Sequence, residues 1–128
     1  MKARIICLLG TIAVLAIMGC SGSKTYRGTW KATDADGKKV EITFDAKSFT
    51  VKDSAGQITT YDYKQNSVQV KNSIKSYGIV LSDGRNYTIY FPYSNDDSIA
   101  LIIDGQGNTI YIISRNDYKE FDEAYKLK

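Results

Sequence analysis

Apolar and polar side chains alternate over most of the chain, and this period of two residues restricts the fold more than any other sequence feature. In one example, Val40, Ile42 and Phe44 are separated by single polar residues. Successive side chains of a strand point to opposite faces, so such alternation predicts strands with one buried face. About nine short segments show the pattern, at residues 29–32, 40–44, 49–51, 58–63, 68–70, 79–81, 87–91, 99–103 and 109–113.

The links between these segments predict how the strands connect. Asp bonds back to its own backbone and Gly adopts positive φ, as hairpin turns require. Consecutive hairpins form an antiparallel meander, and closure into a barrel removes its exposed edges. We therefore expect a mainly β fold, a small antiparallel meander that closes into a β-barrel or curled sheet of about 8–9 strands. Four links combine Asp with Gly, at residues 34–37, 53–56, 82–84 and 104–107.

The C-terminal part of the chain predicts one helix. The segments 99–103 and 110–113 are apolar on both faces, and a strand of that kind is covered on both sides. Tyr118, Phe121 and Tyr125 recur at a spacing that places them on one stripe of a helix. We expect an α-helix over residues 115–127, capped by Ser114 with Asp117 and laid across the last strands.

The first twenty residues have the pattern of an export signal. A basic start is followed by an uncharged apolar run at residues 5–18, which is too short for a spanning helix. The sequence Ile17-Met18-Gly19-Cys20 then resembles the lipobox of bacterial lipoproteins. The resemblance implies cleavage after Gly19 and a lipid on Cys20 that holds the protein to a membrane of the bacterial cell envelope, outside the cytoplasm. An ordinary secretory signal with a chance cysteine is the alternative.

These patterns divide the chain into three parts. Residues 1–19 are the predicted lipoprotein signal peptide, 20–25 the lipidated Cys20 and a tether, and 26–128 a single barrel-like domain. Two of the 17 basic residues fall in the signal, which leaves 15 against 14 acidic residues and a net charge of +1. A domain so nearly neutral offers no basic field for nucleic acid. The basic stretch 64–75 is interpreted as a solvated loop.

The composition of the mature part excludes several kinds of chemistry. The sequence has no His, and its two cysteines are Cys7 in the signal and Cys20 at the anchor. With no histidine and no free cysteine, the mature part lacks the residues for His-based catalytic triads and the usual zinc and copper ligands. The pair Asp34 and Asp36 before Gly37 is interpreted as a hairpin turn, because a calcium loop in that register would lack its acidic ligands. No cofactor, metal site or catalytic residue is expected.

The ten tyrosines are the unusual feature of the composition. Tyrosine offers a large apolar face with a hydrogen-bonding tip, which suits binding surfaces. The alternative is that tyrosine is a favoured strand residue whose hydroxyl reaches water at a barrel rim. The predicted binding surface comprises six aromatic residues, Trp30, Tyr61, Tyr63, Tyr87, Tyr90 and Tyr111.

The opening Gly28-Thr29-Trp30, together with the meander and the terminal helix, resembles the lipocalin-type barrels, which begin with a Gly-x-Trp strand. The main hypothesis is a non-catalytic binding module for a small ligand, a wall polymer or an envelope protein. One alternative is a structural or interaction lipoprotein, an accessory subunit or inhibitor, without a ligand pocket. A carboxylate-based hydrolase is the least favoured alternative, since the 14 acidic residues single out no pair. A cavity lined by tyrosine and Trp30 would favour binding, and a filled barrel would favour interaction.

Overall fold

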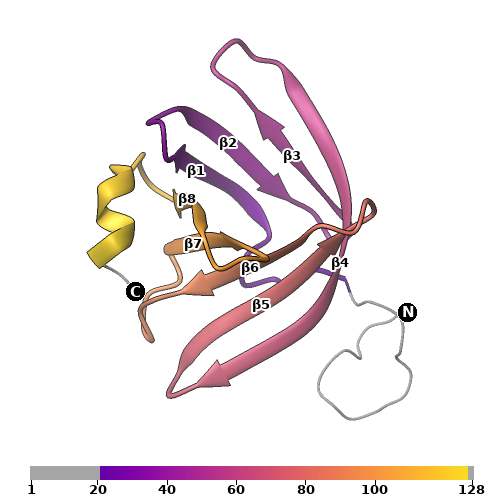
Figure 1. Ribbon diagram of the computed structural model, residues 1–128, viewed down its shortest axis with the longest axis vertical. Helices are drawn as coiled ribbons and strands as arrows, with labels where there is room; N and C mark the ends of the chain where they lie inside the picture. Colours follow the sequence, from indigo (N-terminus) through magenta and orange to yellow (C-terminus); the bar gives the residue numbers. More distant parts are fainter. Residues whose placement is uncertain (1–20, 127–128) are drawn as a thin grey trace.

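Eight antiparallel strands follow one another around a closed barrel in the computed structural model, which describes residues 21–126 (Figure 1). Each strand pairs with the next, and the first also pairs with the last. The predicted fold class is confirmed. The predicted signal peptide and Cys20 lie outside the described residues. The strands are β1 (Gly28–Asp34), β2 (Lys39–Phe44), β3 (Ser48–Lys52), β4 (Ile58–Lys71), β5 (Ile74–Leu81), β6 (Asn86–Phe91), β7 (Ile99–Asp104) and β8 (Thr109–Ser114).

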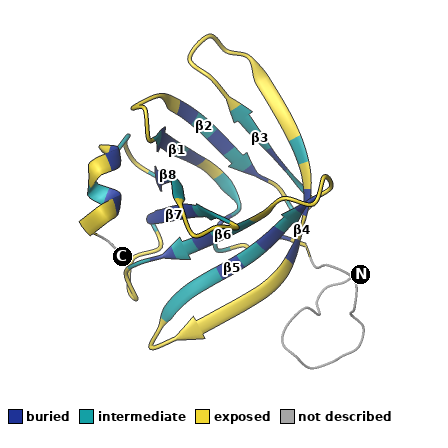
Figure 2. Ribbon diagram, viewed as in Figure 1, coloured by how far each residue is buried: buried dark blue, intermediate teal, exposed yellow. Residues whose placement is uncertain are grey.

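Strand β4 is longer than its alternation predicted. It spans 14 residues and joins the predicted segments 58–63 and 68–70, with an irregularity between Gln65 and Ser67. Its first half pairs with β3 and its second half with β5, and the second half is mostly exposed (Figure 2). The interpretation of residues 64–75 as a loop is therefore wrong. The chain reverses at Asn72 and Ser73, whose positive φ angles of 53° and 66° suit a two-residue hairpin turn.

The four Asp-Gly links are hairpin turns of one kind, and they lie at one end of the barrel because each joins an odd strand to the next even strand. In the first, the Asp34 N–H donates to the Lys38 carbonyl at 3.0 Å and the Gly37 N–H donates back to Asp34. The Asp34 carboxylate also accepts from the N–H groups of Asp36 and Lys38, which confirms the interpretation as a turn. The predicted positive φ is observed at Gly37 (83°), Gly84 (94°) and Gly107 (88°).

The fourth turn allows a test of this geometry with two glycines of one loop. Gly107 has positive φ, whereas Gly105 does not, and a Cβ at Gly105 would make ordinary contacts of 3.6 Å or more. Gly107→Ala is expected to lower the free energy of unfolding by about 1 kcal/mol or more, because an L side chain is strained there. Gly105→Ala should leave it unchanged or raise it slightly. Equal losses in urea denaturation of both variants would contradict the assignment.

The C-terminal helix is shorter than predicted and of a different type. A 3-10 helix, η1 (Phe121–Lys126), replaces the expected α-helix over 115–127. Arg115 instead extends the pairing of the barrel, since its N–H donates to the Ser98 carbonyl and its side chain donates to the Thr29 carbonyl of β1. The side chains of Ser114 and Asp117 bond to each other at 3.3 Å, four residues before the helix begins.

The helix nevertheless covers the last two strands, as predicted. Residues three apart align on a 3-10 helix, and Phe121 and Ala124 are both buried in a cluster on the outer side of β7 and β8. Tyr125, which an α-helix would have placed near that stripe, is 69% exposed. No helix within residues 21–126 is long and apolar enough to cross a membrane.

Candidate functional site

One half of the barrel interior is filled with aromatic rings. Neighbouring ring centroids in this aromatic plug lie 5.2–6.4 Å apart. Edge-to-face and tilted pairs at this spacing add stability beyond the area that they bury. The plug consists of seven buried side chains, which are Tyr26, Trp30, Phe44, Phe49, Tyr63, Tyr77 and Phe91.

Arg115 closes the filled end of the barrel over Trp30. Its guanidinium carbon lies 3.8 Å from the centroid of the indole, whose own N–H donates to the Tyr26 carbonyl at 2.8 Å. The guanidinium also donates to the backbone carbonyls of Thr25, Arg27 and Thr29 at 2.8–3.3 Å. Burial lowers the pKa of Arg115 from its usual value. Trp30, a predicted binding residue, is therefore part of the structural end of the barrel.

Tyr63, another predicted binding residue, also lies in the plug, where its hydroxyl donates to the Asp45 carbonyl. Desolvation by burial raises the pKa of Tyr63 to about 12, and burial raises the pKa of Tyr26 further. Both phenols therefore stay protonated in the folded protein above pH 10, where tyrosines of the unfolded chain ionise.

Alkaline pH should therefore destabilise the barrel in a defined window. Below pH 10 both states hold these protons, and between pH 10 and 12 the unfolded state releases them while the folded state does not. The free energy of unfolding should fall by about 1.4 kcal/mol per pH unit for each tyrosine. Tyr63→Phe should flatten this slope, and Tyr125→Phe, at an exposed position, should not. Equal slopes for both variants in urea titrations would contradict the prediction.

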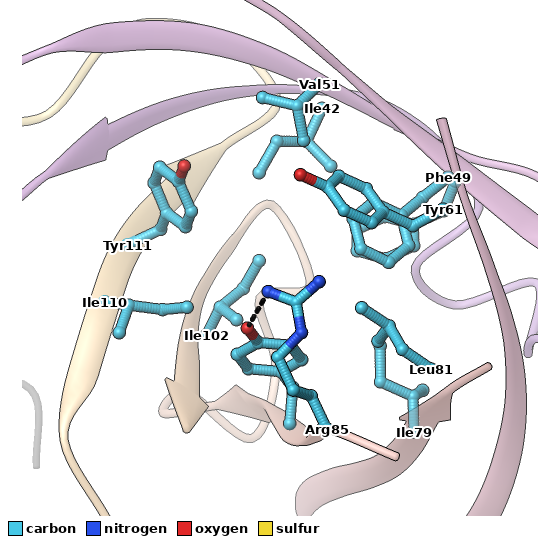
Figure 3. A pocket seen from close by; sticks show the side chains of 12 residues that line it. Ile42, Phe49, Val51, Tyr61, Ile79, Leu81, Arg85, Ile102, Ile110 and Tyr111 are labelled. Carbon is cyan, nitrogen blue, oxygen red and sulfur yellow. Dashed lines mark hydrogen bonds between the residues drawn. The ribbon is translucent and has the colours of Figure 1, made fainter. Parts of the chain in front are cut away.

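The other half of the barrel is hollow. A cavity of about 160 Å³ opens at the end with the four Asp-Gly turns (Figure 3). Phe44 and Phe49 of the plug form part of its floor. Its walls are aliphatic side chains from β2, β3, β5, β7 and β8, namely Ile42, Val51, Ile79, Leu81, Ile102 and Ile110.

Three of the six predicted binding residues meet at this cavity: Tyr61 of β4, Tyr87 of β6 and Tyr111 of β8. The other three do not. Tyr63 shares a face with Tyr61 but lies two residues further toward the filled end. Tyr90 is three residues from Tyr87, so it points out of the barrel, where it packs beside the outer cluster.

Arg85, which the sequence analysis did not single out, completes the mouth. Its Nε donates to both carboxylate oxygens of Asp83, at 2.9 and 3.2 Å, and its Nη2 lies 2.8 Å from Oδ2. Nη1 donates to the Tyr87 hydroxyl at 3.3 Å, and the guanidinium lies 5.5 Å from the centroid of the Tyr61 ring. The dashed line in Figure 3 marks the bond to Tyr87.

The sequences of the four turns contain a feature that could have identified Arg85 as a site residue. Three of them open with an Asp whose carboxylate caps the turn, whereas the third opens with Leu81, which lines the cavity. That turn instead places Asp83 where it binds Arg85, and this hydrogen bond is the largest cause that lowers the pKa of Asp83. A comparison of the four turns position by position would have marked Arg85 as different.

The site combines an apolar interior with a polar rim. Burial, followed by the nearby Asp34, raises the pKa of Tyr111, so its hydroxyl is a hydrogen-bond donor at neutral pH. The lining residues include no carboxylate. Such a site can enclose a small apolar group and donate hydrogen bonds to whatever projects from the mouth. Comparison of the chain with models of protein families, with curated proteins and with solved structures found no match.

Proposed function

We propose that the protein is a lipid-anchored, lipocalin-like binding module that holds a small molecule in the hollow half of its barrel and does no chemistry on it. The cavity of about 160 Å³ behind a tyrosine rim carries this proposal. The main alternative, an interaction lipoprotein without a pocket, does not explain why half of the barrel is hollow. The hydrolase alternative gains no support, since no acidic side chain lines the cavity.

The position of the N-terminal segment supports the anchored orientation. The N–H of Gly22 donates to the Ala46 carbonyl in the link between β2 and β3, and the N–H of Ser23 donates to the Gln65 side chain. Both partners belong to the filled end of the barrel, opposite the Asp-Gly turns. A lipid on Cys20 would therefore hold the filled end toward the membrane and leave the cavity mouth facing away from it.

Filling the cavity tests the binding function. An apolar cavity of about 150 Å³ can take up benzene or xenon, so the wild-type protein should bind both. Ile110→Phe adds a ring to the wall and should abolish this binding, whereas Val68→Phe, at an exposed site of β4 outside the cavity, should not. The readouts are xenon NMR shifts and the melting temperature in benzene. Equal binding by both variants, or none by the wild type, would refute the proposal.

The anchor has its own test. Cys20→Ser should release the protein from membranes and abolish labelling with a fatty acid in cells. Labelling that persists in this variant would refute the lipid attachment at Cys20 and leave the cavity proposal untouched.

A further inference from the structure

The cavity limits the size of its occupant. Its volume of about 160 Å³ is close to that of an apolar cavity that encloses a single benzene ring. The plug side chains Phe44 and Phe49 form part of the floor and prevent a longer molecule from passing down the barrel axis. An acyl chain or a sterol is therefore too large, and the enclosed part of the ligand is about one ring in size.

Arg85 is held in place before any ligand arrives. Two of its nitrogens bind the Asp83 carboxylate side by side, and a third donates to Tyr87. A guanidinium has five N–H donors, so this arrangement leaves one N–H on each terminal nitrogen without a partner among residues 21–126. Figure 3 shows the guanidinium among the lining side chains, with Tyr61 and Tyr111 on two sides of the opening.

The two tyrosines add donors to the same opening. Neither the Tyr61 nor the Tyr111 hydroxyl donates to another group within the described part of the chain. Arg85 and Asp83 form an exposed ion pair, with side chains 50% and 53% exposed, so the pair is close to neutral and Arg85 contributes N–H donors to the opening. The mouth therefore presents several N–H and O–H donors above a ring-sized apolar space.

Planar, two-oxygen acceptors match this set best. A carboxylate accepts two N–H bonds from a guanidinium in parallel, and charge assistance makes such bonds about twice as strong as neutral ones. A single carbonyl or hydroxyl would use one of the donors and leave the others unpaired. We propose, on the basis of the proposed binding function, that the ligand is a compact ring carboxylate whose ring fills the cavity and whose carboxylate binds Arg85, with Tyr61 and Tyr111 as further donors.

Benzoate and benzamide separate the headgroup from the ring, because they have nearly the same shape and differ in charge. A chain that begins at Ser21 suits this test, since the barrel closes on itself and its core clusters lie within residues 26–124. Calorimetry or ligand-detected NMR should show benzoate binding at least about tenfold more tightly than benzamide. Arg85→Gln should remove that difference and leave benzamide binding unchanged. Lys38→Gln, at the matching position of the first turn and outside the cavity lining, should change neither.

The outcomes distinguish this inference from the binding function beneath it. Equal affinities for benzoate and benzamide, or a preference that survives Arg85→Gln, would refute the carboxylate assignment, while xenon binding would still support the cavity. If benzoate, benzamide and xenon all fail to bind to the folded wild-type protein, the binding function itself is wrong. Retained benzamide or xenon binding by Arg85→Gln would show that the variant is folded.

Discussion

Replacing Arg115 with Met is expected to lower the free energy of unfolding by about 3 kcal/mol, although the residue lies after the last strand. The substitution removes a charged donor from three backbone carbonyls and a cation from the face of Trp30. Hydrogen bonds to charged groups contribute about 1.5–3 kcal/mol, and a cation on an aromatic face adds about 0.5–2 kcal/mol. The loss is less than their sum because Arg115 is only half-buried.

Lysine and a double-mutant cycle identify what Arg115 contributes. Arg115→Lys keeps the charge but cannot reach three carbonyls at once, so it should recover less than half of the loss. A cycle with Trp30→Phe should show a coupling energy of about 1 kcal/mol between the two side chains. Gly28 belongs to the same arrangement, because a Cβ there would lie 2.9 Å from the Arg115 guanidinium. Wild-type urea stability of Arg115→Met would contradict this account of the filled end.

Removing the C-terminal segment after Asn116 should destabilise the barrel and cause it to self-associate. Phe121 and Ala124 cover Ile99, Leu101 and Ile112 on the outer face of β7 and β8, and truncation would expose that apolar face. The cut retains Arg115, so the closure over Trp30 stays intact. We expect a lower melting temperature and dimers or larger species in analytical ultracentrifugation.

Two point variants separate burial from helix formation. Phe121→Ala should cost about 3 kcal/mol, since the ring is 9% exposed and buried large apolar residues cost about that much when truncated. Tyr125→Ala lies in the same helix, but at 69% exposure it should have little effect. A truncated chain that stays monomeric with an unchanged melting temperature would show that η1 does not contribute to the fold.

The strands were predictable because hydrophobic alternation and the β geometry share one period, and because Asp with Gly has few uses other than a tight turn. The segment 68–70 in the second half of β4 was predicted, but its continuity with 58–63 was not, since residues 64–67 show no alternation that distinguishes a strand from a loop. The helix type could not be predicted either. Tyr118, Phe121 and Tyr125 have α-helical spacing, whereas the contact of Arg115 with β1, which lies ahead of the helix, joins residues 86 positions apart.

The candidate site was also predictable only in part, because its geometry depends on contacts between residues far apart in the sequence. Residue type suggested tyrosines, and strand parity could have shown that Tyr90 points outward once Tyr87 points inward. Parity says nothing of depth along the barrel axis, which separates Tyr61 at the mouth from Tyr63 in the plug. Depth depends on the stagger of neighbouring strands, as in the pairing of Phe49 with Tyr61, and the alternation pattern carries no information on that stagger.

The division of the barrel into a filled half and a hollow half has a consequence for protein engineering and for divergence. The rings and the Arg115 closure that stabilise the fold lie away from the mouth, so most changes at the mouth should alter ligand choice with little loss of stability. A library could randomise positions Tyr61, Tyr111 and Arg85 while the rest of the barrel stays constant. Selection of such a library for binding in the cavity would explore specificity first, because the folding requirement acts mainly on residues that a molecule in the cavity would not touch.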